Sequence, residues 1–582
     1  MEWGATFAES TWRPNGVPIR SNLKMQAKLR DTFIQIYQPP PMRPILEIAA
    51  ALNLSPSNLM LYGNQMAKLH LDALPAKQNP PPGKIILVSA INPTHSGEGK
   101  TTVSIGLAQG LCRDGHRAAL ALREPSLGPI FGLKGGGTGG GRCQLEPSTR
   151  INMHFTGDIH AIGAAHNLLS ALVDNAVHFH SGLDLEHRQI FWRRVLDVND
   201  RALRNTVTGL GGRLNGVPRE TGFDITAASE VMAILCLAEG VTDLKRRLGK
   251  ILVGFDRSGD PVTADGLQAT GAMSALLQDA ILPNLVQSTE GVPALVHGGP
   301  FGNIAHGCNS IIATKTAAAR ADYVVTEAGF GFDLGAEKFF DLKCRSSGLW
   351  PSAVVLVVTV RALRIHGGGA LAQQGSATEI DRGLEHLNHH VQSVRAFGFE
   401  PIIAINCFAG DREKELSTIE KGCAKLGLIT ARFTGFNEGG AGAEELTQAV
   451  TAAAAKPQPP VKYLYELTES PEAKIEAVAR TIYGAQSLEF SRVAKQDLER
   501  VRCLGYDQLP ICIAKTHLSL SSDPKQIGRP RDFVLPVESV RIAAGAGYLL
   551  ALTGDIVTMP GLPSNPAAYH ITLSDDGEIE GI

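Results

Sequence analysis

Short apolar runs and longer stretches with helical spacing alternate along the chain. The runs typical of buried strands are Ile85–Val88, Ala118–Leu122, Ile251–Phe255, Ala294–Val296, Tyr323–Thr326, Ser352–Val360, Ile402–Cys407 and Ile511–Lys515. The stretches with a helical repeat are Ala161–Ser181, Ala227–Leu248, Leu267–Leu282 and Glu379–Phe397. This alternation predicts an α/β fold with a mostly parallel sheet. Pro44–Leu71 is expected to be a helical hairpin, and Phe533–Leu573 a β-rich region.

A glycine loop follows the first strand and opens a helix. It reads Thr94, His95, Ser96, Gly97, Glu98, Gly99, Lys100, Thr101 and Thr102. Glycines let backbone N–H groups converge at a helix N-terminus, where the helix dipole favours anions. Lys100 would reach the outer phosphates of ATP, and Thr101 would offer its hydroxyl to Mg²⁺. Thr94 stands where the full Walker pattern has glycine, and the alternative is a glycine-rich helix cap with an exposed lysine.

A second polar stretch follows the strand that ends at Leu122. Arg123 and Glu124 come at its carboxyl end, where parallel sheets bind ligands. Residues 135–141 hold six glycines and predict a loop. The polar residues of 152–160, which include His154 and His160, are predicted to line one side of an extended segment. Because these histidines lack a metal-binding spacing, structural hydrogen bonding is the alternative role.

Composition excludes several classes of protein and suggests domain boundaries. The 55 basic and 57 acidic residues leave a net charge of −2, which excludes a nucleic-acid partner, and every apolar run is too short for a membrane span. The nine cysteines contain no CxxC pair, which favours reduced, cytoplasmic thiols, with organelle targeting by residues 1–40 as the alternative. Prolines near 39–44 and the run 452–460 suggest linkers. The expected parts are an N-terminal arm at 1–43, a large nucleotide-binding P-loop domain at 44–375, and two smaller α/β domains at 376–460 and 461–582.

Seven segments together resemble formate–tetrahydrofolate ligases, also called formyltetrahydrofolate synthetases. They are the segments at 90–102, 123–141, 151–162, 293–310, 323–345, 512–524 and 552–568. The resemblance runs from about Pro44 to the C-terminus. It implies ATP-dependent ligation of formate to tetrahydrofolate, giving 10-formyltetrahydrofolate, ADP and phosphate through formyl phosphate. It further implies Mg-ATP as substrate, Mg²⁺, a monovalent cation (K⁺ or NH₄⁺) and a homotetramer.

The resemblance also assigns site residues. Lys100 and Arg123 would be catalytic, with Arg123 at formate or formyl phosphate. Glu124, Phe408 and Phe436 would bind the folate. The alternative for Arg123 is a structural ion pair with Glu124 or Glu98, and either phenylalanine could instead belong to the core.

The chain departs from the family pattern near the folate. Phe436 replaces a tryptophan, and Arg142 and Cys143 replace a Tyr-Ser or Tyr-Ala pair. His517 and Ser522 differ from bacterial members but match the fused eukaryotic relatives more closely. Two other functions therefore stay open: a P-loop ATPase or kinase that activates another carboxylate, and a non-catalytic nucleotide-binding protein.

Overall fold

The computed structural model describes residues 41–74, 83–94, 97–134, 136–179, 182–369, 377–554 and 556–582. All of these except Pro41 belong to one compact unit, Met42–Ile582. The predictions for residues 1–40, His95 and Ser96 therefore lie outside the described residues. Within the described ranges, no helix combines the length and apolar character that crossing a bilayer requires.

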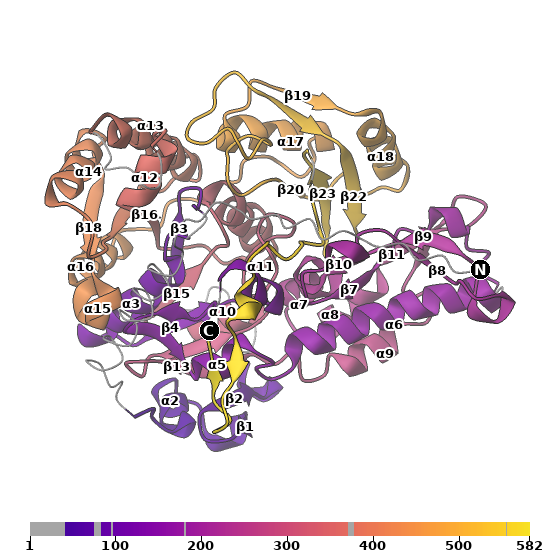
Figure 1. The fold of residues 1–582 in the computed structure, drawn as a ribbon, viewed down its shortest axis with the longest axis horizontal. Coiled ribbons are helices and arrows are strands. Elements are labelled where there is room, and N and C mark those ends of the chain that lie inside the picture. Colours follow the sequence, from indigo (N-terminus) through magenta and orange to yellow (C-terminus); the bar gives the residue numbers. More distant parts are fainter. Residues whose placement is uncertain are drawn as a thin grey trace, which may run out of the picture. The chain divides into compact units, whose positions relative to one another are not determined.

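A 12-stranded mixed sheet organises this unit (Figure 1). Its order is β1 (Leu59–Tyr62), β2 (Met66–Leu69), β13 (Asn284–Ser288), β14 (Pro293–Val296), β4 (Ala118–Leu122), β15 (Tyr323–Glu327), β3 (Lys84–Ala90), β16 (Ala353–Val358), β17 (Ile402–Asn406) and β18 (Ile429–Phe433). The short strands β5 (Gly139–Gly140) and β6 (Cys143–Glu146) join it through β13. Neighbours from β14 to β18 are all parallel, whereas β1, β2 and β13 pair antiparallel. The predicted α/β class is confirmed.

Both faces of the sheet are covered, which explains why its central strands are continuously apolar. In β3, Ile85 and Leu87 join one hydrophobic cluster, while Ile86 and Val88 join another on the opposite face. The first cluster includes residues of α10 (Ile311–Ala318) and α13 (Ala377–Ala396), and the second includes residues of α3 (Lys100–Arg113) and α16 (Glu444–Ala454). The other main helices are α2 (Ile45–Ala51), α6 (Asp158–Phe179), α7 (Glu230–Leu237), α8 (Val241–Gly249), α9 (Thr270–Leu276), α12 (Val360–His366), α14 (Glu413–Lys425), α17 (Pro471–Val478) and α18 (Arg492–Cys503).

Four of the predicted local structures differ from those observed. The helical hairpin over Pro44–Leu71 is one helix, α2, followed by the β1–β2 hairpin, because Gly63 turns the chain at a φ of 71° and β2 pairs with β13. The segment 152–160 is not extended: α5 (Ser148–Asn152) ends there and α6 begins at Asp158. The helix predicted at 227–248 is split into α7 and α8, and the one at 267–282 is limited to α9.

The C-terminal part forms smaller sheets. β19 (Ser487–Phe490) pairs with β21 (Val534–Val537), and β20 (Ile511–Ala514) lies beside β23 (Tyr548–Leu552) and β22 (Ser539–Ala543). Strands β17 and β18, expected in a separate middle domain, extend the large sheet. The proposed boundary near 375 therefore falls between neighbouring strands of one sheet, and the division into domains stays a prediction.

Candidate active site

Polar residues gather where six neighbouring parallel strands end. Parallel strands bring their carboxyl ends to the same edge of a sheet, which is where ligands bind in such folds. At this edge the chain leaves β4 at Arg123, β3 at the glycine loop, β17 at Phe408 and β18 at Phe436. β15 ends with Glu327 at the same edge. Segments more than 300 residues apart in sequence therefore meet beside the glycine loop.

The glycine loop has the backbone that its sequence predicts. Gly97 and Gly99 lie in the left-handed region, with φ of 72° and 75°, and Gly99 directly precedes α3. A Cβ at Gly99 would collide with the side-chain amide of Asn406. Only glycine therefore fits this position without strain.

Side chains from neighbouring segments hold this loop. The buried Glu98 carboxylate accepts hydrogen bonds from the Thr94 backbone N–H (2.8 Å) and the Thr359 hydroxyl (2.6 Å). Asn406 donates to the Glu98 carbonyl (3.0 Å), and Arg361 donates to the Gly97 carbonyl (2.8 Å). Glu98 thus has a bracing role and is not the partner of Arg123.

Glu327 connects the start of α3 with Arg123. The Thr101 hydroxyl donates to Glu327 Oε2 at 2.8 Å, and Arg123 Nη2 lies 3.6 Å from Glu327 Oε1. Arg123 also donates to the Pro300 carbonyl at 3.2 Å, and its side chain keeps 21% exposure. Sequence reasoning missed Glu327 as a site residue, although an acidic residue that closes a buried strand at this edge was a usable signal.

Glu124 is buried beside a cavity of about 340 Å³. His154, His160, Asn167 and Asp197 also line this cavity. Burial raises the Glu124 pKa well above its ordinary value, and the nearby charges of Asp158 and Asp197 raise the pKa further. Among the described residues, no hydrogen-bond partner reaches Glu124 Oε2. A buried carboxyl group of this kind favours the protonated form and can donate a hydrogen bond.

Phe408 and Phe436 are both partly exposed, at 43% and 41%. Neither phenylalanine is therefore a buried core residue. The Arg361 guanidinium lies 5.6 Å from the centre of the Phe408 ring. Two aromatic faces accessible at one sheet edge can stack on a flat ligand ring.

Comparison with known proteins shows which family the chain belongs to. The family model described as formate–tetrahydrofolate ligase matches residues 31–582, beginning before Pro44. A protein of that name from Myxococcus xanthus is 54% identical over 548 residues, covering 93% of this chain and 99% of the relative. The protein of that name from Hyphomonas neptunium is 52% identical over 551 residues, covering 94% of this chain and 99% of the relative. The one from Bacillus licheniformis is 50% identical over 560 residues, covering 96% of this chain and 100% of the relative.

The chain belongs to the formate–tetrahydrofolate ligase family. It is therefore an enzyme of the ligase class. Two of the positions predicted to depart from the family pattern lie next to Phe436. The Arg142 N–H donates to the Phe436 carbonyl at 2.9 Å, and the buried Cys143 thiol donates to the Gly435 carbonyl at 3.1 Å. The ring of Phe436 faces Gly140, where a Cβ would lie 3.1 Å from it.

The structural alternative for His154 and His160 stays a prediction, and both line the cavity beside Glu124. Other polar residues of this segment do have structural partners. Asn152 accepts from the Gly137 N–H at 2.8 Å and so fixes the second glycine loop. Thr156 donates to Asn284 at 2.7 Å, and Asp158 forms a buried ion pair with Lys68 at 2.7 Å. Among the described residues, no group of three or more His, Cys, Asp or Glu side chains could hold a metal ion.

Proposed function

We propose that this member of the formate–tetrahydrofolate ligase family joins formate to tetrahydrofolate with ATP, through formyl phosphate. The observation that carries the proposal is the convergence of Lys100, Thr101, Glu327 and Arg123 at one edge of the sheet. Formate is a poor acyl donor because its oxygen is a poor leaving group. Phosphorylation supplies a better one.

In the first step, a formate oxygen attacks the γ-phosphorus of ATP, the bond to the bridging oxygen breaks, and ADP leaves. Positioning and charge neutralisation supply most of the catalysis in such a transfer. We assign the phosphates to a P-loop variant comprising residues 94–102, with Lys100 as its mobile cation. Held at Glu327, the Arg123 guanidinium presents a planar pair of donors suited to formate and to formyl phosphate.

The oxygens at the start of α3 fit Mg²⁺. The Thr101 hydroxyl and the Glu327 carboxylate lie within hydrogen-bond distance of each other, and hydroxyl, carboxylate, water and phosphate oxygens are the ligands that Mg²⁺ prefers. We propose that these two residues hold the ion, which would neutralise phosphate charge. The monovalent cation, K⁺ or NH₄⁺, stays a prediction without assigned ligands.

In the second step, N10 of tetrahydrofolate attacks the formyl carbon, phosphate leaves, and N10 loses its proton. We propose that Phe408 and Phe436 flank the pterin, since both are accessible at this edge. Glu124, protonated through burial, would donate a hydrogen bond to the folate.

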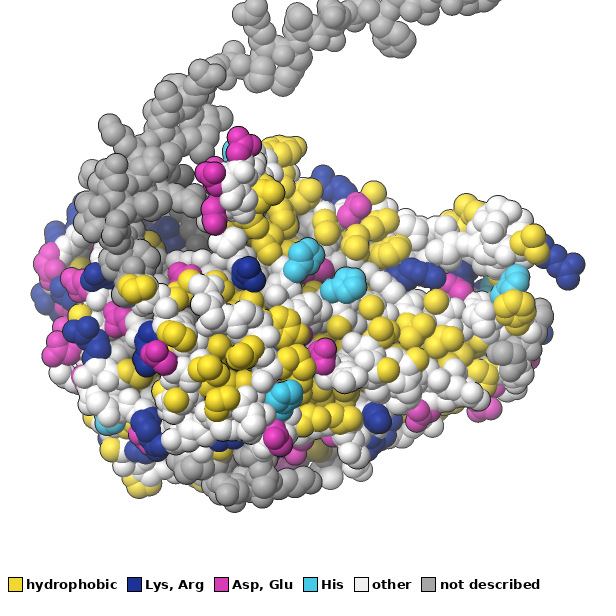
Figure 2. All heavy atoms as spheres, turned by 90° about the horizontal axis from the view of Figure 1, so that it is seen from below, with side chains coloured by type: hydrophobic (Ala, Val, Ile, Leu, Met, Phe, Trp, Pro, Cys, Tyr) yellow, Lys and Arg dark blue, Asp and Glu magenta, His cyan; other side chains and the backbone are white. Residues whose placement is uncertain are grey.

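Assembly into a homotetramer also stays a prediction. Figure 2 shows hydrophobic side chains gathered on one face of the molecule. Among the exposed apolar residues are Leu46 of α2, Leu61 of β1 and Leu71. An exposed patch of this kind suits contact with another subunit.

The test of the function is ADP release from Mg-ATP and formate, with and without tetrahydrofolate, together with formation of formylated folate. We expect one formyl-folate per ADP, and loss of turnover in Lys100→Ala with the fold retained. ADP release that requires a different carboxylate and yields no formyl-folate would instead identify a kinase-like activator of that carboxylate.

A further inference from the structure

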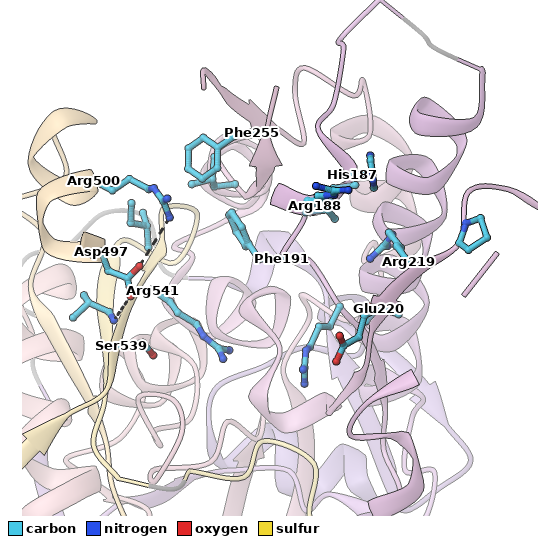
Figure 3. A pocket seen from close by; sticks show the side chains of 17 residues that line it. His187, Arg188, Phe191, Arg219, Glu220, Phe255, Asp497, Arg500, Ser539 and Arg541 are labelled. Atoms are coloured by element: carbon cyan, nitrogen blue, oxygen red, sulfur yellow. Dashed lines mark hydrogen bonds and ion pairs between the residues drawn. The ribbon is translucent and has the colours of Figure 1, made fainter. Parts of the chain in front are cut away.

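A cavity of about 880 Å³ lies away from the candidate active site. Its walls come from four parts of the chain: residues 187–193, residues 218–221 around β9 (Arg219–Thr221), β11 (Leu252–Phe255), and the α18–β22 region. Figure 3 shows Arg500 and Arg541 reaching from the C-terminal wall toward the wall that carries Phe191 and Arg219. This volume is typical of a small-molecule site.

The lining of the cavity is rich in arginine, although the chain as a whole is nearly neutral. Five arginines line it (Arg188, Arg193, Arg219, Arg500 and Arg541), against two lining carboxylates, Glu220 and Asp497. Asp224 and Asp174, outside the lining, pair with two of the arginines. The whole chain carries a net charge of −2, so composition does not account for this concentration of arginines.

Three of the arginines are fixed by other side chains. Arg219 is buried and donates twice to Asp174, at 2.8 and 3.0 Å, and Arg193 lies 3.3 Å from Asp224. The Arg500 guanidinium lies 5.0 Å from the centre of the Phe255 ring. Guanidinium groups held in place lose little entropy when they bind an anion.

The other two arginines supply uncompensated charge. Among the described residues, no carboxylate lies within ion-pair distance of Arg188 or Arg541, and both side chains are exposed to the cavity. They come from opposite walls, so one ligand with two separated anionic groups can engage both. Phe191, 48% exposed in the same cavity, adds an apolar contact surface.

We propose that this cavity is a second ligand site, which binds a small molecule carrying at least two phosphate or carboxylate groups. Guanidinium groups bind both oxyanions in a two-pronged manner, so phosphate and carboxylate ligands share the chemistry. Because such a ligand bridges two walls, its binding raises the melting temperature.

The test is calorimetric titration of the full chain, in low salt without Mg²⁺, with citrate and with tripolyphosphate. The tripolyphosphate arm uses Lys100→Ala as background, because the glycine loop is also expected to bind phosphates. The double variant Arg188→Ala/Arg541→Ala is expected to weaken binding at least tenfold and to abolish the rise in melting temperature. Arg492→Ala, an exposed arginine on the same helix as Arg500 but outside the cavity, is expected to change binding less than twofold.

Binding of citrate alone would identify a polycarboxylate, and binding of tripolyphosphate alone a polyphosphate; either supports the site. Absence of binding by both probes, or equal weakening in the double variant and in Arg492→Ala, would overturn it. The readout needs no turnover, so a failed ligase assay would leave this result unaffected.

Discussion

Glu327 contacts two parts of the candidate site through separate oxygens. Oε2 accepts the hydroxyl of Thr101, and Oε1 faces Arg123. The side chain of Glu327 is only 7% exposed, so its charge acts in a medium where water screens little. In the proposed mechanism it would therefore orient the arginine and offer an oxygen to a magnesium ion.

Replacing this carboxylate tests that double role. Glu327→Gln is expected to lower kcat by about 10²–10³, the usual effect of losing one preorganised electrostatic contact. The KM for tetrahydrofolate is expected to change less than twofold. Steady-state kinetics beside Glu385→Gln, which loses a surface ion pair with Arg531, provides the control. A kcat within twofold of wild type would remove Glu327 from the mechanism.

The folate assignment depends on the exposed rings. Phe436→Ala is expected to raise the KM for tetrahydrofolate about tenfold, since an aromatic stack is worth roughly 1 kcal/mol beyond its buried area. Phe436→Trp, which restores the residue typical of the family, is expected to leave the KM equal or lower. Phe179→Ala, an exposed ring at the end of α6, serves as control. If the KM is the same in Phe436→Ala as in wild type, the folate slot lies elsewhere.

At the scale of elements, the glycine loop depends on its neighbours. Its conformation is held by Thr359, which follows β16, and by Asn406 at the end of β17. Both strands belong to the sheet that contains β3. Displacement of either strand would therefore move the proposed phosphate site.

Gly99→Ala tests this dependence. The new Cβ would require a left-handed backbone and would displace Asn406, breaking its bond to Glu98. The KM for ATP is expected to rise at least tenfold. Gly115→Ala, at φ 85° with open space around it, is the matched control. It is expected to lose about 1 kcal/mol of stability with unchanged kinetics. Equal kinetics in the two variants would contradict the bracing role.

At the scale of the whole molecule, seven histidines among the described residues are buried, which favours their neutral form. Burial lowers the pKa of His166 and His297 to about 4 and that of His306 to about 3. It also lowers the pKa of four histidines on α12 and α13: His366, His386, His389 and His390. The unfolded chain therefore binds more protons at these histidines than the folded chain does below pH 6.5.

Stability is accordingly expected to fall on acidification. Each histidine contributes to the free energy of unfolding in full above pH 6.5. This contribution is lost as the pH falls toward the pKa of the folded state, and it amounts to about 3 kcal/mol for a folded pKa of 4. Buried acids oppose this: burial raises the pKa of Glu230 and Asp341 to about 7, which favours the folded state at lower pH. Burial also raises the pKa of Glu124 and Glu337 well above their ordinary values, so these two acids oppose the histidines as well. We expect the larger number of histidines to decide the balance.

Thermal unfolding midpoints between pH 7 and 5 check this expectation. The midpoint is expected to fall with pH, and to fall more steeply in Glu230→Gln, which removes an opposing group while its amide oxygen can still accept from Gly545. A midpoint that rises toward pH 5 would show that the buried acids dominate.

The sequence by itself determined the features whose causes are local. A continuous apolar run followed by glycines and a helix predicted β3, the loop and α3, because strand burial and left-handed glycine conformations depend on nearby residues. The family was also readable, since its motifs are long and ordered. The roles of Lys100, Arg123, Phe408 and Phe436 stay predictions.

Only the tertiary structure decided the features that join distant residues. Glu327 lies 204 positions from Arg123 in the sequence, and Lys68 forms its ion pair with Asp158 in the core. The segment β2 is a strand because it pairs with β13. Strands β17 and β18 join the large sheet for the same reason. Hydrogen bonds and ion pairs between such partners depend on their proximity in the fold, which local periodicity does not encode.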